Sequence, residues 1–206
     1  MRDILLGALR LSLVTLVLCG LAYPLAVTAI GQWLLPWQAN GSLQTDARGE
    51  IIGSLLIGQR WDGPEWFHGR PSATTAADPQ NPDQPVPAPY NAAGSGGSNL
   101  GPSSKVLFDR LKNDRAALEE ALPEVRQSLL PSDFLTSSGS GLDPDISPAN
   151  AALQVVRVAR ARGVPAPEIQ ALVKKHTVAR MVGIFGEPRV NVLELNMDLK
   201  GRYSKP

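Results

Sequence analysis

Hydrophobic residues dominate the first part of the chain, and their distribution predicts one membrane-spanning helix. Residues 11–45 contain no charged side chain, and the first half of this run is almost entirely hydrocarbon. A bilayer core of about 30 Å needs about 20 consecutive apolar residues in a helix, and residues 11–35 supply them. Pro24 within this run predicts a kink. Because a single helix encloses no polar path, we expect the chain to act on solutes only with partners.

The basic residues around the run predict its orientation. Arg2 and Arg10 precede it, whereas the first basic residue after it is Arg48. Basic residues favour the cytoplasmic side of a membrane. We therefore expect residues 1–10 to form a short cytoplasmic N-terminus and residues 46–206 to lie on the opposite, extracytoplasmic side.

A cleaved signal peptide is the alternative explanation of the same run. The apolar run, however, is longer than the apolar region of a signal peptide, which usually has about 7–15 residues. Trp33 and Trp37 also resemble the aromatic anchors that lie at membrane interfaces. The pattern therefore favours a retained anchor.

Later segments show both helical and strand-like periodicity. Residues 50–59 read as a strand or hairpin, and residues 193–199 alternate between apolar and polar side chains as in a half-buried strand. Leu107, Leu111, Leu118 and Leu122 share one face of a helix that Pro123 ends. The sequence thus predicts a single N-terminal transmembrane helix followed by one α+β extracytoplasmic domain.

Two further helices are indicated by their end signals. Ser147 is placed as the N-cap of a helix that starts at Pro148, runs to Arg162 and ends at Gly163. Another helix starts at residues 167–168 and carries Ile169, Leu172 and Val173. Residues 78–89 hold five prolines and little that can pack, so we expect a polyproline-like or disordered surface loop there.

Charge and cysteine content narrow the functional class. With Arg2, Arg10 and Asp3 set aside, the 20 basic and 19 acidic residues leave equal numbers of each sign, so the predicted domain is neutral. A neutral domain lacks the basic surface that binds nucleic acid. Cys19, the single cysteine, lies in the apolar run, so the domain has no internal disulfide.

Residues for catalysis or metal binding are sparse. His68 and His176 are the two histidines, and neither has a second ligand at metal-site spacing. The serines of residues 137–140 lack the spacing of a nucleophile elbow. The glycine-rich residues 94–101 lack the Gly-Lys-Ser/Thr ending of a P-loop. We therefore expect no catalytic residues, no bound metal and no enzyme activity, with a membrane-anchored extracytoplasmic enzyme as the alternative.

A polar stripe is predicted on the helix that Ser147 caps. Asn150, Gln154 and Arg157 follow one another at i, i+4 and i+7, and we expect the opposite side of the helix, with Val155 and Val156, to face the core. The stripe suits a docking surface, although a solvated face is the simpler interpretation. The candidate docking residues are Ser98, Asn99, Asp143, Asp145, Asn150 and Arg157.

Five motifs occur in a characteristic order after the apolar run. They are GSLLIGQ at 53–59, FHGRPS at 67–72, YNAAGSGGSNLGPSS at 90–104, the loop and helix at 133–163, and GEPRVNVLELN at 186–196. In this order the chain resembles the C subunit of the Kdp-type potassium-transporting ATPase of bacteria over almost its whole length. Residues 78–89 are the part without a match.

The resemblance implies a place in a high-affinity, ATP-driven potassium uptake complex of the inner membrane. Its partners would be a channel-like subunit, a P-type ATPase subunit and a small single-span subunit. The C subunit of this family is needed for assembly and is described as a catalytic chaperone that raises the affinity of the ATPase subunit for ATP. Gln154 matches the helix glutamine implicated in contacting the nucleotide, and ATP would bind only within the complex.

The predicted topology conflicts with that nucleotide contact. Gln154 would lie outside the cytoplasm, whereas ATP is found inside. An outer cap on the channel-like subunit agrees better with the topology, with Asp143 and Asp145 enriching cations near an entrance. A nucleotide-binding regulator acting directly through Gln154 remains the alternative.

Overall fold

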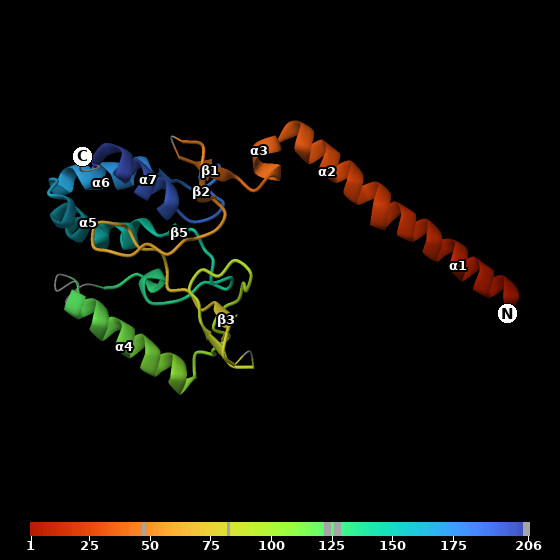
Figure 1. Ribbon diagram of the computed structural model, residues 1–206, viewed down its shortest axis with the longest axis horizontal. Helices are drawn as coiled ribbons and strands as arrows, with labels where there is room; N and C mark the ends of the chain where they lie inside the picture. Colours follow the sequence, from red (N-terminus) through yellow and green to blue (C-terminus); the bar gives the residue numbers. More distant parts are fainter. Residues whose placement is uncertain (47, 82, 122–124, 126–128, 204–206) are drawn as a thin grey trace. The chain divides into compact units, whose positions relative to one another are not determined.

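The computed structural model of the chain describes residues 1–46, 48–81, 83–121, 125 and 129–203. Clustering of contacts divides the chain into two compact units, Met1–Ile52 and Gly53–Pro206. Figure 1 shows the course of the chain through both units.

A long apolar helix makes up most of the first unit (Figure 1). It consists of α1 (Arg2–Val17), the π-helical turn η1 (Leu18–Ala22) and α2 (Tyr23–Leu34). Its 33 residues reach a mean hydropathy of 2.3 in the most apolar window, which makes it long and apolar enough to cross a membrane. The helix begins before the predicted start at residue 11 because Arg2 and Arg10 are good helix formers.

Pro24 disturbs this helix without ending it. A proline removes one N–H donor and crowds the carbonyl group four residues earlier. In the turn just before it, the Tyr23 N–H donates to the Leu18 carbonyl oxygen, five residues back. The irregularity at Pro24 therefore takes the form of a widened π turn.

After the long helix the chain forms a short helix and a two-stranded sheet. Helix α3 (Pro36–Ala39) is followed by β1 (Leu43–Thr45), which pairs with β2 (Ile51–Ser54). The strand predicted within residues 50–59 is thus confirmed in its first half, while residues 55–57 form a turn and a bend.

Three helices enclose most of the core of the second unit. Both ends of α5 (Pro148–Arg162) are as predicted, because the Ser147 hydroxyl accepts the Asn150 N–H and Gly163 ends the helix at φ 68°. Helix α6 (Ala166–Lys175) follows and confirms the helix predicted from residues 167–168, and its Ile169, Leu172 and Val173 are buried.

The third helix corrects a prediction. Residues 193–199 form part of α7 (Val192–Tyr203) and not a strand. The buried residues Val192, Leu195, Asn196 and Leu199 follow the i, i+3, i+4, i+7 spacing of a helix face. Because Asn196 is polar, the pattern of apolar residues did not indicate that it is buried. The remaining apolar residues alternate with polar ones, which led to the prediction of a strand.

A small antiparallel sheet packs with these helices. Its strands stand in the order β5 (Asp145–Ile146), β7 (Arg189–Asn191) and β6 (Thr177–Val178). The core cluster also receives Phe67 from the irregular segment between β2 and β3, and Trp61 and Trp66 pack against the cluster. The largest buried apolar side chains of the described residues are Phe67, Ile146, Ile169, Leu195, Leu199, Val125, Val158 and Val190.

The expected outward orientation of the α5 stripe is wrong. Asn150 and Gln154 are each 1% exposed, whereas Val156 is 44% exposed. The apolar core face of α5 is Ala151, Val155, Val158 and Ala159, beside the two buried amides. The polar side chains turn inward because, as shown below, they find hydrogen-bond partners there.

The proline-rich stretch is more ordered than expected. Strands β3 (Thr75–Ala77) and β4 (Pro85–Pro87) form an antiparallel hairpin, so the surface-loop prediction for residues 78–89 fails for β4. The Ala88 N–H donates to the Thr74 carbonyl oxygen. Since N–H direction alternates along a strand, the nitrogens of Pro85 and Pro87 face away from β3 and no ladder hydrogen bond is lost.

Helix α4 (Lys105–Ala121) confirms the helix predicted from the spacing of its leucines. Leu107, Leu111 and Leu118 are half-buried on one face. Leu122 and Pro123, predicted to complete and end this helix, lie outside the described residues.

Candidate functional site

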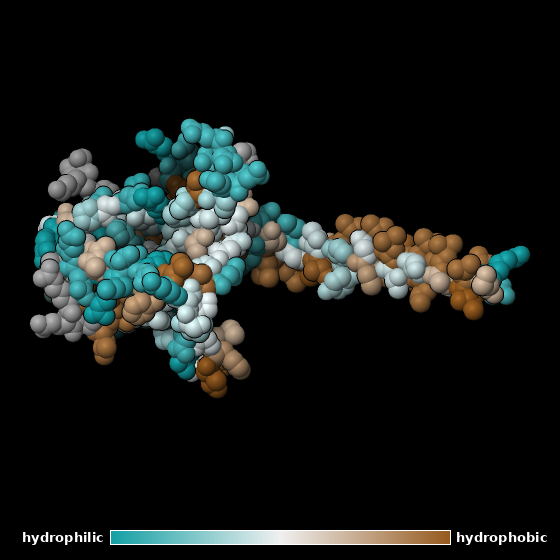
Figure 2. Space-filling model, turned by 90° about the horizontal axis from the view of Figure 1, so that it is seen from below, coloured by the Kyte–Doolittle hydropathy of each residue, from teal (hydrophilic) through white to brown (hydrophobic). Residues whose placement is uncertain are grey.

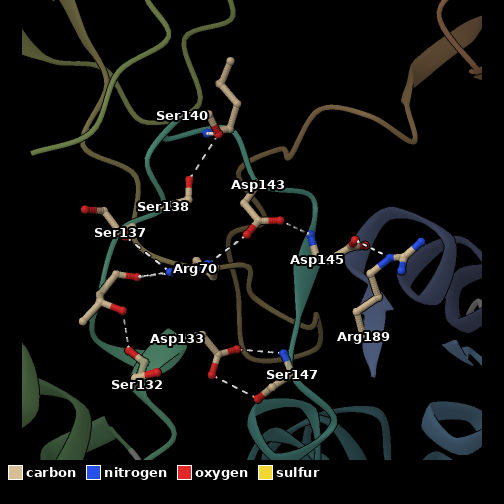
Figure 3. Close-up of polar contacts among 12 residues, drawn as sticks. Arg70, Ser132, Asp133, Ser137, Ser138, Ser140, Asp143, Asp145, Ser147 and Arg189 are labelled. Atoms are coloured by element: carbon tan, nitrogen blue, oxygen red, sulfur yellow. Dashed lines mark hydrogen bonds and ion pairs between the residues drawn. The ribbon is translucent and has the colours of Figure 1, made fainter. Parts of the chain in front are cut away.

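A network of loops converges on Arg70, within the FHGRPS motif (Figure 3). Its Nη1 donates to Asp143 Oδ2 at 2.9 Å, and the other guanidinium nitrogens donate to the carbonyl oxygens of Thr136 and Ser137. The Arg70 carbonyl oxygen accepts the Tyr90 hydroxyl at 2.6 Å. Arg70 thus joins its own segment to residues 136–143 through its side chain and to Tyr90 through its carbonyl oxygen.

Tyr90 acts in this network as a hydrogen donor. Burial raises the pKa of Tyr90 to about 12, and the negative charge of Asp143 adds to the effect. The phenol is therefore protonated at neutral pH and donates continuously to Arg70. The Tyr90 N–H in turn donates to the Ser72 hydroxyl, which donates to the Gly141 carbonyl oxygen.

The two aspartates proposed for docking lie together but are already paired. The Asp145 N–H donates to Asp143 Oδ1 at 3.0 Å, and Arg189 Nε lies 2.9 Å from Asp145 Oδ2. Burial raises the pKa of Asp145, and the positive charge of Arg189 opposes that change. Figure 3 shows both carboxylates directed at arginines on either side of the loop.

A shallow hollow of about 380 Å³ lies over this network. Three of the four carboxylates in its lining are paired with an arginine, Glu187 with Arg180 outside the lining, so the hollow carries only a weak negative charge. The charged lining residues are Asp133, Asp143, Asp145, Glu187, Arg70 and Arg189. Among the described residues, no group of three His, Cys, Asp or Glu side chains is placed to share a metal ion. The hollow can attract cations but holds no dedicated site for one.

The glycine- and serine-rich loops are structural partners of each other. The Gly96 N–H and the Ser95 hydroxyl both donate to the Ser140 carbonyl oxygen. At Gly141, with φ +66°, a Cβ atom would lie 2.6 Å from the Gly96 carbonyl oxygen. Ser98 is half-buried beyond this contact and Asn99 is exposed, so the structure does not gather them with Asp143 and Asp145.

Gln154, the predicted nucleotide contact, lies in a second network in the core. Its Oε1 accepts the His68 N–H at 2.8 Å and Arg157 Nη2 at 2.7 Å. Its Nε2 donates to the His68 carbonyl oxygen and to Asn150 Oδ1. Both amide donors and both acceptor positions of Gln154 are therefore occupied within the chain.

Asn150 links Gln154 to Asp133. Besides accepting from Gln154, it donates through Nδ2 to Asp133 Oδ2 at 3.1 Å. Asp133 also accepts the N–H and the hydroxyl of Ser147, the N-cap of α5. A continuous chain of hydrogen bonds thus runs from the Asp133 turn through Asn150 to Gln154 and His68.

The two histidines are bound within the domain. His68 Nε2 lies 2.8 Å from the Gly63 carbonyl oxygen, and burial lowers the pKa of His68, with the charge of Arg157 adding to the effect. His176 ends α6, and its Nε2 lies 2.8 Å from Asp198 Oδ2.

Arg70, Asp133 and Asn196 were not singled out from the sequence. Asn196 accepts the Phe67 N–H and donates to the Phe67 carbonyl oxygen, both at 2.9 Å. Each of these side chains finds its partners across at least 14 residues of sequence. The only sequence signal available was their position inside the matched motifs FHGRPS, 133–163 and GEPRVNVLELN.

Comparisons with known proteins agree with this arrangement of motifs. The family model of the K⁺-transporting ATPase c chain, KdpC, matches residues 5–201. Potassium-transporting ATPase KdpC subunits of Rhodopseudomonas palustris and Bradyrhizobium diazoefficiens are each 53% identical over 198 residues, covering 96% of this chain and 94% and 96% of theirs. The subunit of Methylorubrum extorquens is 52% identical over 199 residues, covering 95% of this chain and 97% of its own. The chain therefore belongs to the KdpC family, the c chain of K⁺-transporting ATPases.

Proposed function

We propose that this chain is a non-catalytic accessory subunit of an ATP-driven potassium uptake complex, anchored in the inner membrane by its N-terminal helix. The observation that carries the proposal is that, in the described part of this KdpC-family chain, one helix, Arg2–Leu34, is long and apolar enough to cross a membrane. One helix satisfies its own backbone but forms no path for an ion. The chain therefore serves transport by stabilising partners: a channel-like subunit, a P-type ATPase subunit and a small single-span subunit.

The second unit fits the role of an outer cap on the channel-like subunit. Arg2 and Arg10 favour a cytoplasmic N-terminus and hence an extracytoplasmic, periplasmic position for the second unit. The hollow over Asp143 and Asp145 carries more carboxylates than arginines. Placed near a channel entrance, such a surface raises the local concentration of K⁺ without binding it tightly.

Any increase in ATP affinity is best explained by assembly. Gln154 is 1% exposed and its polar atoms are occupied by His68, Asn150 and Arg157. A direct contact with adenine would require breaking these bonds in the core. We therefore place the chaperone effect in the contact between subunits and keep the direct nucleotide regulator as the alternative.

Exchange of the helix tests the assembly role. Residues 1–35 are replaced by an unrelated single-span anchor of the same orientation, and the complex is purified through a tag on the ATPase subunit. We expect reduced recovery of this chain and lower potassium-stimulated ATP hydrolysis. Full recovery with normal transport would contradict a specific role of the helix in assembly.

Protease accessibility tests the topology. In intact spheroplasts, externally added protease should digest the second unit while a cytoplasmic marker protein stays protected. Protection of the second unit would reverse the orientation and make direct contact with ATP feasible.

A further inference from the structure

Four large apolar side chains are exposed together on the loop between β6 and β7. Met181 is 69% exposed, Val182 82%, Ile184 70% and Phe185 63%. We call residues 181–185 the apolar tip. Its sequence, MVGIF, holds no charged residue. On the face that Figure 2 shows, the second unit is mostly teal or white, with brown patches between.

The backbone of the apolar tip has a defined conformation. The Met181 N–H donates to the Phe185 carbonyl oxygen at 2.8 Å, and the Met181 carbonyl oxygen accepts the N–H groups of Ile184 and Phe185. Val182 has φ +54° and Gly183 has φ +75°. A β-branched residue is strongly disfavoured at positive φ, so Val182 is strained in this turn. Strain of this kind persists where the surrounding structure fixes it, and it is concentrated at functional positions.

The base of the apolar tip is neutral and firmly attached. Arg180 Nη2 donates to both carboxylate oxygens of Glu187, at 2.7 and 2.8 Å. Arg189, on β7, is paired with Asp145. The adjacent Val190 is fully buried in the core, so β7 holds the loop against the body of the unit. Both arginines flanking the tip are thus neutralised by carboxylates.

We propose that the apolar tip inserts into an apolar pocket on a larger membrane subunit of the same complex, an inference that rests on the proposed accessory function. The absence of charge from 181 to 186 fits a pocket lined by aliphatic and aromatic side chains. A turn already fixed in one conformation loses little entropy on binding, which favours a shape-specific protein pocket. Such buried apolar anchors carry most of the binding energy of an interface.

The charge pattern argues against a lipid surface as the occupant. Segments that bind anionic lipid headgroups combine apolar side chains with surplus Lys or Arg. Here Arg180 and Arg189 both have carboxylate partners. A bilayer also does not require one fixed turn, whereas a pocket does.

Photocrosslinking in the whole complex identifies the occupant. A benzoylphenylalanine replaces Phe185 in one sample and Phe108, which is 67% exposed on α4, in a matched control. We expect position 185, and not position 108, to give an adduct of this chain with a larger subunit. Adducts at 185 only with lipid, only with a second copy of this chain, or in equal yield at 108 would each overturn the proposal.

Substitution measures the contribution of the tip. Ile184→Ser combined with Phe185→Ser should lower recovery of this chain with the complex at least tenfold after washing, while Phe108→Ser changes it little. The Phe185→Leu variant should be recovered with the complex far better than the Phe185→Ser variant, because leucine keeps an apolar side chain at this position. If the unsubstituted chain itself fails to copurify with other subunits, the accessory function is wrong. If it copurifies and the double variant does so equally well, only the docking of the tip is wrong.

Discussion

The side-chain amide of Gln154 binds the backbone of His68 at two points, accepting its N–H at 2.8 Å and donating to its carbonyl oxygen at 3.0 Å. Asn196 binds the preceding residue, Phe67, in the same way. Backbone polar groups taken out of water need partners, and no strand among the described residues pairs with this irregular segment. The side-chain amides of Gln154 on α5 and Asn196 on α7 therefore provide the hydrogen bonds that a neighbouring strand would otherwise provide. Gln154 is thus primarily a structural residue.

Replacement of Gln154 tests this interpretation. Gln154→Ala leaves the N–H and carbonyl groups of His68 without these partners and removes buried volume. We expect the free energy of unfolding to fall by about 2–4 kcal/mol. The measurement is chemical denaturation of the full chain in detergent, followed by the fluorescence of Trp61 and Trp66, whose rings pack 5.0 Å apart.

The exposed Gln170 on α6 provides the matched control. Gln170→Ala should change the free energy of unfolding by less than about 0.5 kcal/mol. A direct nucleotide contact makes a different prediction, namely that Gln154→Ala leaves the stability unchanged and raises the KM for ATP of the whole complex. That pattern would contradict the structural role.

A helix feature could be predicted from the sequence when it depends on contacts between residues close together in the chain. Ser147, Pro148 and Gly163 determine the ends of α5 through contacts within a few residues, so both ends were predicted. The face of α5 that turns inward was not predicted because Gln154 and Asn150 are buried by partners distant in sequence. In α7 the same cause produced a wrong element, since Asn196 occupies a core position that hydropathy assigns to the surface.

The glycine loops behave differently at two neighbouring positions. Gly141→Ala should destabilise the chain by about 2–4 kcal/mol, because Gly141 has φ +66° and a Cβ would lie 2.6 Å from both the Gly96 carbonyl oxygen and Thr74 Cγ2. At Gly139 nothing lies within 4 Å of a Cβ, and its φ is not in the left-handed region. Gly139→Ala is therefore expected to be neutral to within about 0.5 kcal/mol. Equal effects in thermal unfolding would show that the close contact of the two loops does not form.

For the candidate site, the sequence indicated which segments contribute residues, but not which side chains pair with one another. Asp143 and Asp145 were recognised as neighbours in one loop, and both do lie in the same hollow. Their arginine partners lie at positions 70 and 189, and no local spacing relates those residues to the loop. The side chains that organise the site were therefore found only once the fold had brought them together.

Arg70 should contribute more to the free energy of unfolding than the exposed Arg60. Arg70→Ala removes hydrogen bonds to Asp143, Thr136 and Ser137 while leaving their acceptors half-buried. We expect a loss of about 1–3 kcal/mol in the free energy of unfolding. Arg60 pairs with Asp62, but both side chains are mostly exposed, at 63% and 73%.

Arg60→Ala is accordingly the control, with an expected loss below about 1 kcal/mol. Proteolysis under native conditions separates the two cases further. Arg70→Ala should expose residues 136–140 to cleavage, since Arg70 binds the carbonyl oxygens of Thr136 and Ser137. An unchanged cleavage pattern would mean that the loop is held by its other contacts, such as the Ser72 bond to Gly141.

Asp198 makes the stability of the C-terminal region dependent on pH. Burial alone would raise the pKa of Asp198, but hydrogen bonds from Lys175, His176 and Arg202 outweigh it and lower the pKa far below its usual range. A carboxylate whose pKa is lowered by folding stabilises the folded state above its unfolded pKa of about 3.9. That contribution is lost as the pH falls toward the lower folded pKa.

Asp198→Asn measures this contribution. At pH 7 the substitution should reduce the free energy of unfolding by about 1 kcal/mol, a modest value because Lys175 and Arg202 are 58% and 49% exposed and solvent screens them. The difference between the two proteins should be constant above about pH 5 and should shrink below about pH 4, as the wild-type carboxylate becomes protonated in the unfolded chain. Asp109→Asn, at an exposed position on α4, should show almost no difference at pH 7. Denaturation curves of Asp198→Asn that parallel the wild type with a constant offset down to pH 3 would contradict the proposed linkage, because the loss would then come from shape and not from charge.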